Sequence, residues 1–179
     1  WILGSDAIVK CSNDSCFTLS TAGQLLSIWA SDINHAWIVG SGTSIIRCID
    51  NSCKTITTGA PPALLGVWGS DSEHAWAVGG NGSIVKCNGN NCSNLSTQTV
   101  QPFVFTWGDN FNTIEAISLF GKIATCNDNS CALRPAEIRD VSPPYSFKAI
   151  WGSDANNVWV AGGGGTIIKC SSNTCTAIP

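Results

Sequence analysis

The cysteines of this sequence come in five pairs, and the two members of every pair are five residues apart. The paired segments read CSNDSC, CIDNSC, CNGNNC, CNDNSC and CSSNTC, and small polar residues dominate between the cysteines. Residues at this spacing that flank a four-residue hairpin loop lie opposite each other on neighbouring antiparallel strands, within reach of a disulfide. We therefore expect five disulfides that each close their own hairpin: Cys11–Cys16, Cys48–Cys53, Cys87–Cys92, Cys126–Cys131 and Cys170–Cys175.

Zinc is the competing explanation for paired cysteines, and the pattern does not favour it. A structural zinc site takes four ligands from two converging pairs, usually with a two-residue spacer within each pair. Five pairs cannot be divided in that way, so we expect no metal and no cofactor. Stable disulfides persist in oxidising compartments, which predicts a secreted or cell-surface protein.

An internal repeat becomes visible when the residues before the cysteine pairs are aligned. Four copies open on a tryptophan, and these tryptophans are 39, 39 and 44 residues apart: Trp29, Trp68, Trp107 and Trp151. A second marker follows eight residues later in each copy: Trp37, Trp76, Glu115 and Trp159. The first cysteine of the pair comes eleven residues after that marker, so the whole chain is organised by one repeat.

Each copy predicts four short strands. In one copy the apolar runs LLGVW, AWAVG and SIVKC alternate with the polar turns GSDSEH and GNG, and a last strand follows Cys92. Four antiparallel strands in 39 residues is the size of a propeller blade. We predict an all-β, single-domain β-propeller of about five blades, with approximate boundaries 1–24, 25–63, 64–102, 103–146 and 147–179.

The repeat also resembles a known family. The segments VWGSDSEHAWAVGGNGSIVKC and IWGSDANNVWVAGGGGTIIKC look like the WGS…W-x-V-G repeats of bacterial β-propellers, over the whole chain. This resemblance implies a surface, adhesion or binding module. Small five-bladed lectins of the tachylectin kind are similar in repeat count, although none of their sugar-binding motifs can be transferred to this sequence.

The segment WILGSDAIVKC at the start of the sequence matches only the second half of the repeat. Counting strands gives nineteen rather than twenty, so the first blade lacks one strand. Three interpretations stay open: a ring that closes with an incomplete blade, a missing preceding segment, or a longer propeller. The final TAIP is too short to supply the absent strand.

Composition excludes several classes of function. The net charge is −3 and only 12% of the residues are charged, so the chain offers no basic surface for nucleic acid. The apolar fraction of 44% and the eight tryptophans argue against disorder. No window of eighteen apolar residues exists, so we expect no membrane span.

The repeated aromatic and charged positions favour structural roles. The repeated tryptophans are expected to pack between blades, and Glu115 to be either sequence drift at an exposed edge, which we favour, or a local functional change. We interpret His35 and His74, together with Asp32, Asp71 and Asp154, as turn residues rather than ligands of a metal ion. The cations that precede the first cysteine of four pairs are interpreted as solvated side chains: Lys10, Arg47, Lys86 and Lys169.

One insertion interrupts the repeat, and it provides the candidate binding site. The stretch ALRPAEIRDVSPPYSF adds five residues, and loops on a rigid scaffold commonly carry function. The candidate binding residues are Arg134, Glu137, Arg139, Asp140 and Tyr145. Four sequons permit N-glycosylation, at Asn13, Asn81, Asn91 and Asn94.

These observations favour a non-catalytic extracellular module that recognises a glycan or a surface protein. With all cysteines in disulfides and both histidines in turns, no nucleophile–base pair is visible and no catalytic residue is assigned. The alternative is a structural subunit, or part of a larger surface protein, filament or sheath, with self-association. A glycosidase-like enzyme that relies on Glu115 or Glu137 is the third interpretation.

Overall fold

The structure is a computed structural model that describes residues 1–4, 6–13, 15–20, 23–42, 44–59, 63–119, 121–133, 138–139, 147–154, 156–171 and 174–178. Within these ranges the regular structure is β-strand, apart from two short 3₁₀ turns at Gly80–Gly82 and Gly163–Gly165. No helix in the described part of the chain is long and apolar enough to cross a membrane.

The strands form five sheets, which we number as blades 1 to 5 in chain order. Blade 1 contains β1 (Ile2–Leu3), β2 (Ala7–Ser12) and β3 (Ser15–Ser20). Blade 2 contains β4 (Leu25–Ala30), β5 (His35–Gly40), β6 (Ser44–Ile49) and β7 (Ser52–Thr57). Blade 3 contains β8 (Leu64–Gly69), β9 (His74–Gly79), β10 (Ile84–Asn88) and β11 (Asn91–Leu95). Blade 4 contains β12 (Phe103–Asn110), β13 (Thr113–Ser118), β14 (Ile123–Cys126) and β15 (Cys131–Leu133). Blade 5 contains β17 (Phe147–Asp154), β18 (Asn157–Gly162), β19 (Ile167–Ser171) and β20 (Thr174–Ile178), with β16 (Ile138–Arg139) added at its edge.

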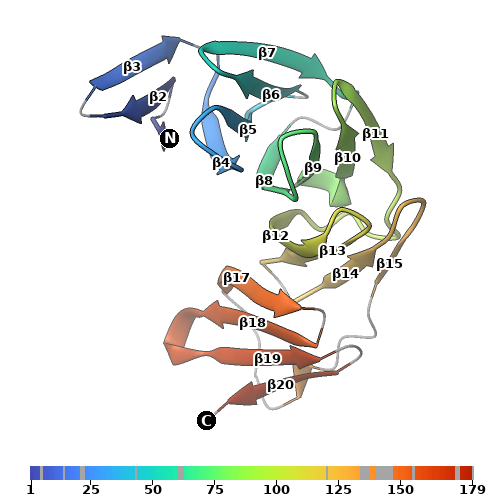
Figure 1. Ribbon diagram of the computed structural model, residues 1–179. Helices are drawn as coiled ribbons and strands as arrows, with labels where there is room; N and C mark the ends of the chain where they lie inside the picture. The colour runs from blue at the N-terminus through green and yellow to red at the C-terminus, as the bar shows by residue number, and fades with distance from the viewer. Residues whose placement is uncertain are drawn as a thin grey trace.

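The five sheets follow one another along an open arc (Figure 1). The first strands of the complete blades, β4, β8, β12 and β17, lie on the inner side of this arc and contact one another in succession. This arrangement confirms the predicted all-β, five-bladed propeller. Blade 1 lies at one end of the arc and blade 5 at the other, and the ring is open between them.

Blade 1 confirms the prediction of one absent strand. Its three strands pair in the order β1-β2-β3, and β2 and β3 carry the first disulfide. The strand β1 pairs with β2 as β5 pairs with β6 in blade 2, so the position that is not filled is the innermost one.

The hairpins confirm the five predicted disulfides and correct the predicted loop length. Each cysteine pair occupies directly opposed ladder positions, with Cα atoms 4.0–4.1 Å apart. The sequence predicts a four-residue loop, but in blades 1, 2, 3 and 5 the strands pair for one further position, as in Ile49↔Ser52. The turn therefore has two residues. Its first residue has a positive φ at Asn13, Asp50 and Gly89, which Asn, Asp and Gly tolerate best.

The hydrophobic core lies between the blades rather than within any one of them. Four clusters of buried residues each join two successive blades. In the cluster between blades 3 and 4, Trp76 and Ile84 of blade 3 meet Phe103 and Ile114 of blade 4. Because a central strand is covered by a blade on each face, Ala75–Gly79 of β9 is buried at every residue.

The repeated tryptophans confirm the predicted packing role in the first three complete blades. Each of Trp29, Trp68 and Trp107 lies against a glycine on the inner strand of the next blade. A Cβ atom added to Gly108 would lie 2.8 Å from Trp68 Cζ3, and one on Gly152 would lie 2.7 Å from Trp107 Cζ2. Only a residue without a side chain leaves room for the ring at this position.

Candidate functional site

Four of the five candidate binding residues from the sequence lie outside the part of the chain that the structure describes: Arg134, Glu137, Asp140 and Tyr145. Arg139 belongs to the two-residue strand β16, which pairs in parallel with β20. The insertion was expected to be a loop, but part of it adds a strand to blade 5, because the outer strand of a sheet presents unpaired backbone groups.

The aspartates confirm their predicted role in the turns, whereas His35 and His74 are the first residues of strands β5 and β9. Asp32, Asp71 and Asp154 each accept a hydrogen bond from a backbone N–H two residues later, at 2.6, 2.8 and 2.9 Å. The rings of His35 and His74 lie 2.8–2.9 Å from the Asp32 and Asp71 carboxylates. Among the described residues, no group of three or more His, Cys, Asp or Glu side chains could hold a metal ion.

The cations before the cysteines correct the sequence interpretation, because three of them are not solvated. Lys10 is only 6% exposed; it lies 5.5 Å from the Trp1 ring and donates to Asn34 Oδ1 and to the backbone oxygen of Asp50, both in blade 2. Arg47 and Lys86 repeat the arrangement: each lies over the tryptophan of its own blade and pairs with a carboxylate of the next, Glu73 or Asp128. The side chains connect neighbouring blades, which the sequence of a single repeat cannot reveal.

Glu115 is a second correction. The sequence interpretation placed it at an exposed edge, but Glu115 is 3% exposed and sits on the central strand β13. It lies directly opposite Trp107, as Trp76 lies opposite Trp68 in blade 3. Because blade 5 covers this face of blade 4, the position is buried whichever residue occupies it.

A pocket of about 490 Å³ lies at the outer hairpins of blades 3 and 4. Blade 3 lines it with the β10–β11 hairpin, and blade 4 with the β12–β13 turn and the β14–β15 hairpin. Four of the nine lining residues are asparagines, and the full lining is Lys86, Asn88, Asn91, Cys92, Ser93, Phe111, Asn112, Asp128 and Asn129. Small-molecule sites commonly occupy 300–1,000 Å³.

Phe111 provides the apolar wall of this pocket, and several contacts hold it in place. The ammonium of Lys86 lies 3.8 Å from the centre of the Phe111 ring, and the His74 ring centre lies 4.1 Å away. Trp76 Nε1 donates a hydrogen bond of 2.9 Å to the Phe111 backbone oxygen. The turn that carries Phe111 is held by Asn110 Oδ1, which accepts a hydrogen bond from the N–H of Asn112 at 2.9 Å. The aromatic wall is thus fixed by the interface between two blades.

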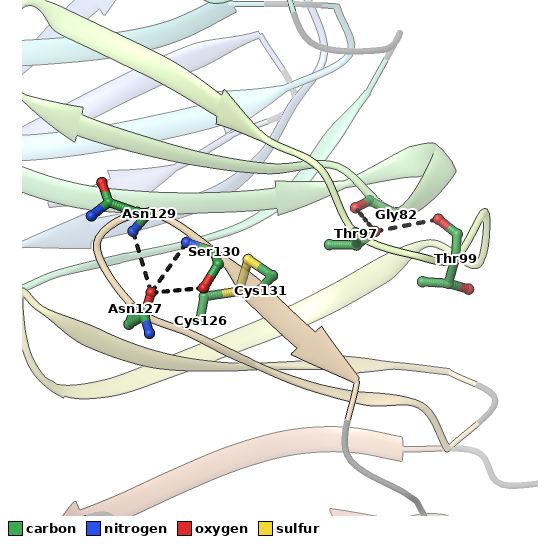
Figure 2. The surroundings of a disulfide bond; sticks show 8 residues. All are labelled: Gly82, Thr97, Thr99, Cys126, Asn127, Asn129, Ser130 and Cys131. Carbon is green, nitrogen blue, oxygen red and sulfur yellow. Dashed lines mark hydrogen bonds between the residues drawn. A yellow bond between two sulfur atoms is a disulfide. The ribbon is translucent and has the colours of Figure 1, made fainter.

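The hairpin that carries Asp128 and Asn129 is also rigid. Figure 2 shows the Cys126–Cys131 disulfide beside the turn, with Asn127 Oδ1 as a common acceptor. This oxygen accepts from the N–H of Asn129 at 3.3 Å and from the N–H and hydroxyl of Ser130 at 3.1 and 3.0 Å. Because the turn is held before a ligand arrives, binding there costs little conformational entropy.

The pocket can form many hydrogen bonds with little net charge. Each Asn amide offers two donors and one acceptor, and the charges of Lys86 and Asp128 are paired with each other. Sequence reasoning missed this site because its residues come from two repeats and are, within each repeat, of the types that ordinary turns contain. One signal was available: Phe111 stands in a turn where blades 2 and 3 have Ile33 and Ser72.

The fold and the disulfide-closed blades define the class of protein: a β-propeller whose five disulfides indicate an oxidising environment. One solved structure that the chain resembles is YCF48 from Cyanidioschyzon merolae, with a TM-score of 0.64 and 17% sequence identity. The match covers 86% of this chain and 55% of that one, so the chain spans about half of the length of the solved protein. No protein-family model and no curated protein matches the sequence.

Proposed function

We propose that this protein is a non-catalytic extracellular recognition module that binds a neutral glycan in the pocket between blades 3 and 4. The observation that carries the proposal is the lining of the pocket. Four asparagines, Asn88, Asn91, Asn112 and Asn129, surround one apolar wall formed by Phe111. A sugar presents hydroxyl groups beside C–H surfaces, so amides and an aromatic ring match both parts of it.

The location is part of the proposal. Five disulfides and no free cysteine among the described residues support secretion or display on a cell surface. The resemblance to bacterial surface propellers supports the same conclusion and rests on the repeat motif alone. A surface protein remains the alternative ligand for the same pocket.

N-glycosylation of the chain itself matters for the test. The four sequon side chains, Asn13, Asn81, Asn91 and Asn94, are exposed. Asn91 also lines the pocket, so a glycan attached there would occupy the proposed binding site. Protein for binding measurements should therefore be produced without N-glycosylation.

The test is a glycan array, followed by calorimetry with the best ligand. We expect Asn112→Ala and Asn129→Ala each to weaken binding about fivefold, because a lost hydrogen bond costs about 1 kcal/mol and about 1.4 kcal/mol is a factor of ten. The matched control is Asn156→Ala, at the equivalent turn position of blade 5, which should bind as the unaltered protein does. An array without signal, or the same loss in all three variants, would contradict the proposal.

A structural role in a larger surface protein, filament or sheath is the second candidate. It is favoured by one observation: Trp151 and Trp159 of blade 5 are 64% and 38% exposed. Light scattering over a range of protein concentrations separates the two functions. A monomer that binds sugars supports recognition, whereas ordered oligomers that bind no sugar support the structural role.

A further inference from the structure

Blade 5 exposes an apolar surface that we call the end face. It is formed by Trp151 of β17, Trp159 and Ala161 of β18, Ile167 and Lys169 of β19, and Ile178 of β20. Ladder pairing places Trp151, Trp159 and Lys169 side by side across three strands, with Ala161, Ile167 and Ile178 as the next row. The end face is therefore one continuous patch, larger than the scattered apolar residues of an ordinary surface.

The equivalent face of blade 3 is buried by blade 4. Trp76, Val78 and Ile84 of blade 3 are 0% exposed, and they stand at the positions of Trp159, Ala161 and Ile167 in blade 5. The end face thus carries the residues of an inter-blade interface. Within the described residues, no blade covers it.

The tryptophan of the end face indicates what would fit against it. Trp29, Trp68 and Trp107 each meet the glycine of the next blade, at Gly69, Gly108 and Gly152. Trp151 is the fourth member of this series and is 64% exposed. A partner that covers Trp151 in the same way must present a backbone without a side chain at that point.

The cation of the end face indicates which group the partner must place beside it. Lys169 lies 5.3 Å from the Trp159 ring, as Lys86 lies 5.0 Å from the Trp76 ring. Lys10, Arg47 and Lys86 each reach oxygen acceptors on the outer hairpins or turns of the following blade. A partner in the same geometry must therefore offer a carboxylate or carbonyl oxygen to Lys169.

We propose that the end face binds a further β-propeller blade of the same repeat, with a glycine against Trp151 and an oxygen acceptor against Lys169. Blade 1 of a second copy does not fit, because its sheet lacks the inner strand that would carry the glycine. Blade 2 has Ala30 at the position of the glycine, and the glycines of blades 3, 4 and 5 are already covered by the tryptophans of their own neighbours. The occupant is therefore a blade outside these five.

The test extends the full chain by a copy of its own third blade. Residues 58–95 are repeated after Pro179, which keeps the seven-residue connection between Ile56 and Leu64. The copied blade brings Gly69 for Trp151 and Glu73 for Lys169. Hydroxyl-radical footprinting, read for each peptide by mass spectrometry, measures the reactivity of Trp151 and Trp159 in the extended and the original chain.

We expect the extension to reduce the reactivity of Trp151 and Trp159 to that of Trp29 and Trp37. The matched control carries Gly69→Val in the copied segment only, and it should leave Trp151 as reactive as in the original chain. Unchanged reactivity in the extended chain overturns the proposal, because the copy supplies every group that covers Trp29. Protection of both tryptophans in the original chain as it oligomerises also overturns it, since the occupant would then be a second copy.

Discussion

Strands β9 and β18 have closely related sequences and very different surroundings. The segments HAWAVG and NVWVAG occupy the second position of blades 3 and 5. In β9 the five residues after the histidine are all buried, whereas β18 alternates between buried and exposed residues. The repeat therefore specifies an apolar strand, and the neighbouring blade decides whether one face or both faces of it become core.

The largest expected effect tests this difference directly. Trp76→Ala should destabilise the protein by about 3–5 kcal/mol, the usual cost of removing a fully buried large side chain. Trp159→Ala should cost only about 1 kcal/mol, because its ring is already partly in water. Urea unfolding with the disulfides intact measures both variants. Equal losses would contradict the comparison between the two blades.

A smaller effect is expected when a disulfide of the covered blade 3 is compared with the disulfide of blade 1, at one end of the arc. Removing either Cys87–Cys92 or Cys11–Cys16 by paired Cys→Ser substitution loses about 2 kcal/mol of loop constraint. Cys87 is buried against blade 2, whereas Cys16 is exposed. The blade 3 variant should lose about 1–2 kcal/mol more, since its new hydroxyls enter an apolar interface. Thermal unfolding of the two variants side by side measures the difference in stability. A larger loss of stability in the blade 1 variant would contradict the expectation that the buried disulfide of blade 3 matters more.

The smallest effect should be shared by blades 3 and 5, because the carboxylates of Asp71 and Asp154 accept hydrogen bonds from residues of their own turns. Burial raises the pKa of Asp71, but hydrogen bonds from the His74 ring and the Glu73 N–H outweigh it and hold that pKa below its usual value. The Asn157 amide and the Asn156 N–H lower the pKa of Asp154. A lowered carboxyl pKa contributes stability that is complete above about pH 4 and is lost as the pH falls through the folded-state pKa.

The measurement compares the unaltered chain with Asp71→Asn and Asp154→Asn between pH 2 and pH 6. In both blades, the difference in stability between the unaltered chain and its Asn variant should decrease as the pH falls. Blade 4 provides the control, because Asn110 already replaces the carboxylate there and accepts from Asn112 at 2.9 Å. The loss of stability in Asn110→Ala should not change with pH, because the Asn110 amide does not titrate. A pH trend in only one of the two Asp variants would contradict the expectation that the two turns behave alike.

Much of the fold could be predicted because each repeat contains the residues that determine its own strands, turns and disulfide. Polar turn residues delimit β8, β9, β10 and β11, and the five-residue cysteine spacing fixes which hairpins carry disulfides. The absent inner strand of blade 1 was visible as a half repeat. In blades 1, 2, 3 and 5 the predicted loop was too long by one ladder pair, because the spacing of two cysteines does not state where pairing ends.

The candidate site was less predictable, because its residues come together from different repeats. Lys86 was interpreted as solvated, yet it lies over Trp76 of its own blade and pairs with Asp128 of the next. Glu115 was assigned to an edge, yet it is central and covered. The amide-lined pocket depends on the contact between the Phe111 turn and the β10–β11 hairpin, which are separate in sequence and adjacent only in the folded arc.

The sequence by itself determined the strands, the turns and the cysteine pairing, because these depend on residues within one hairpin. Only the tertiary structure decided which faces are core, where the cations go and which turns border a common pocket. The physical reason is that a blade cannot bury its own faces. Burial and charge pairing are supplied by the next blade, and the open arc leaves one such face on blade 5 exposed.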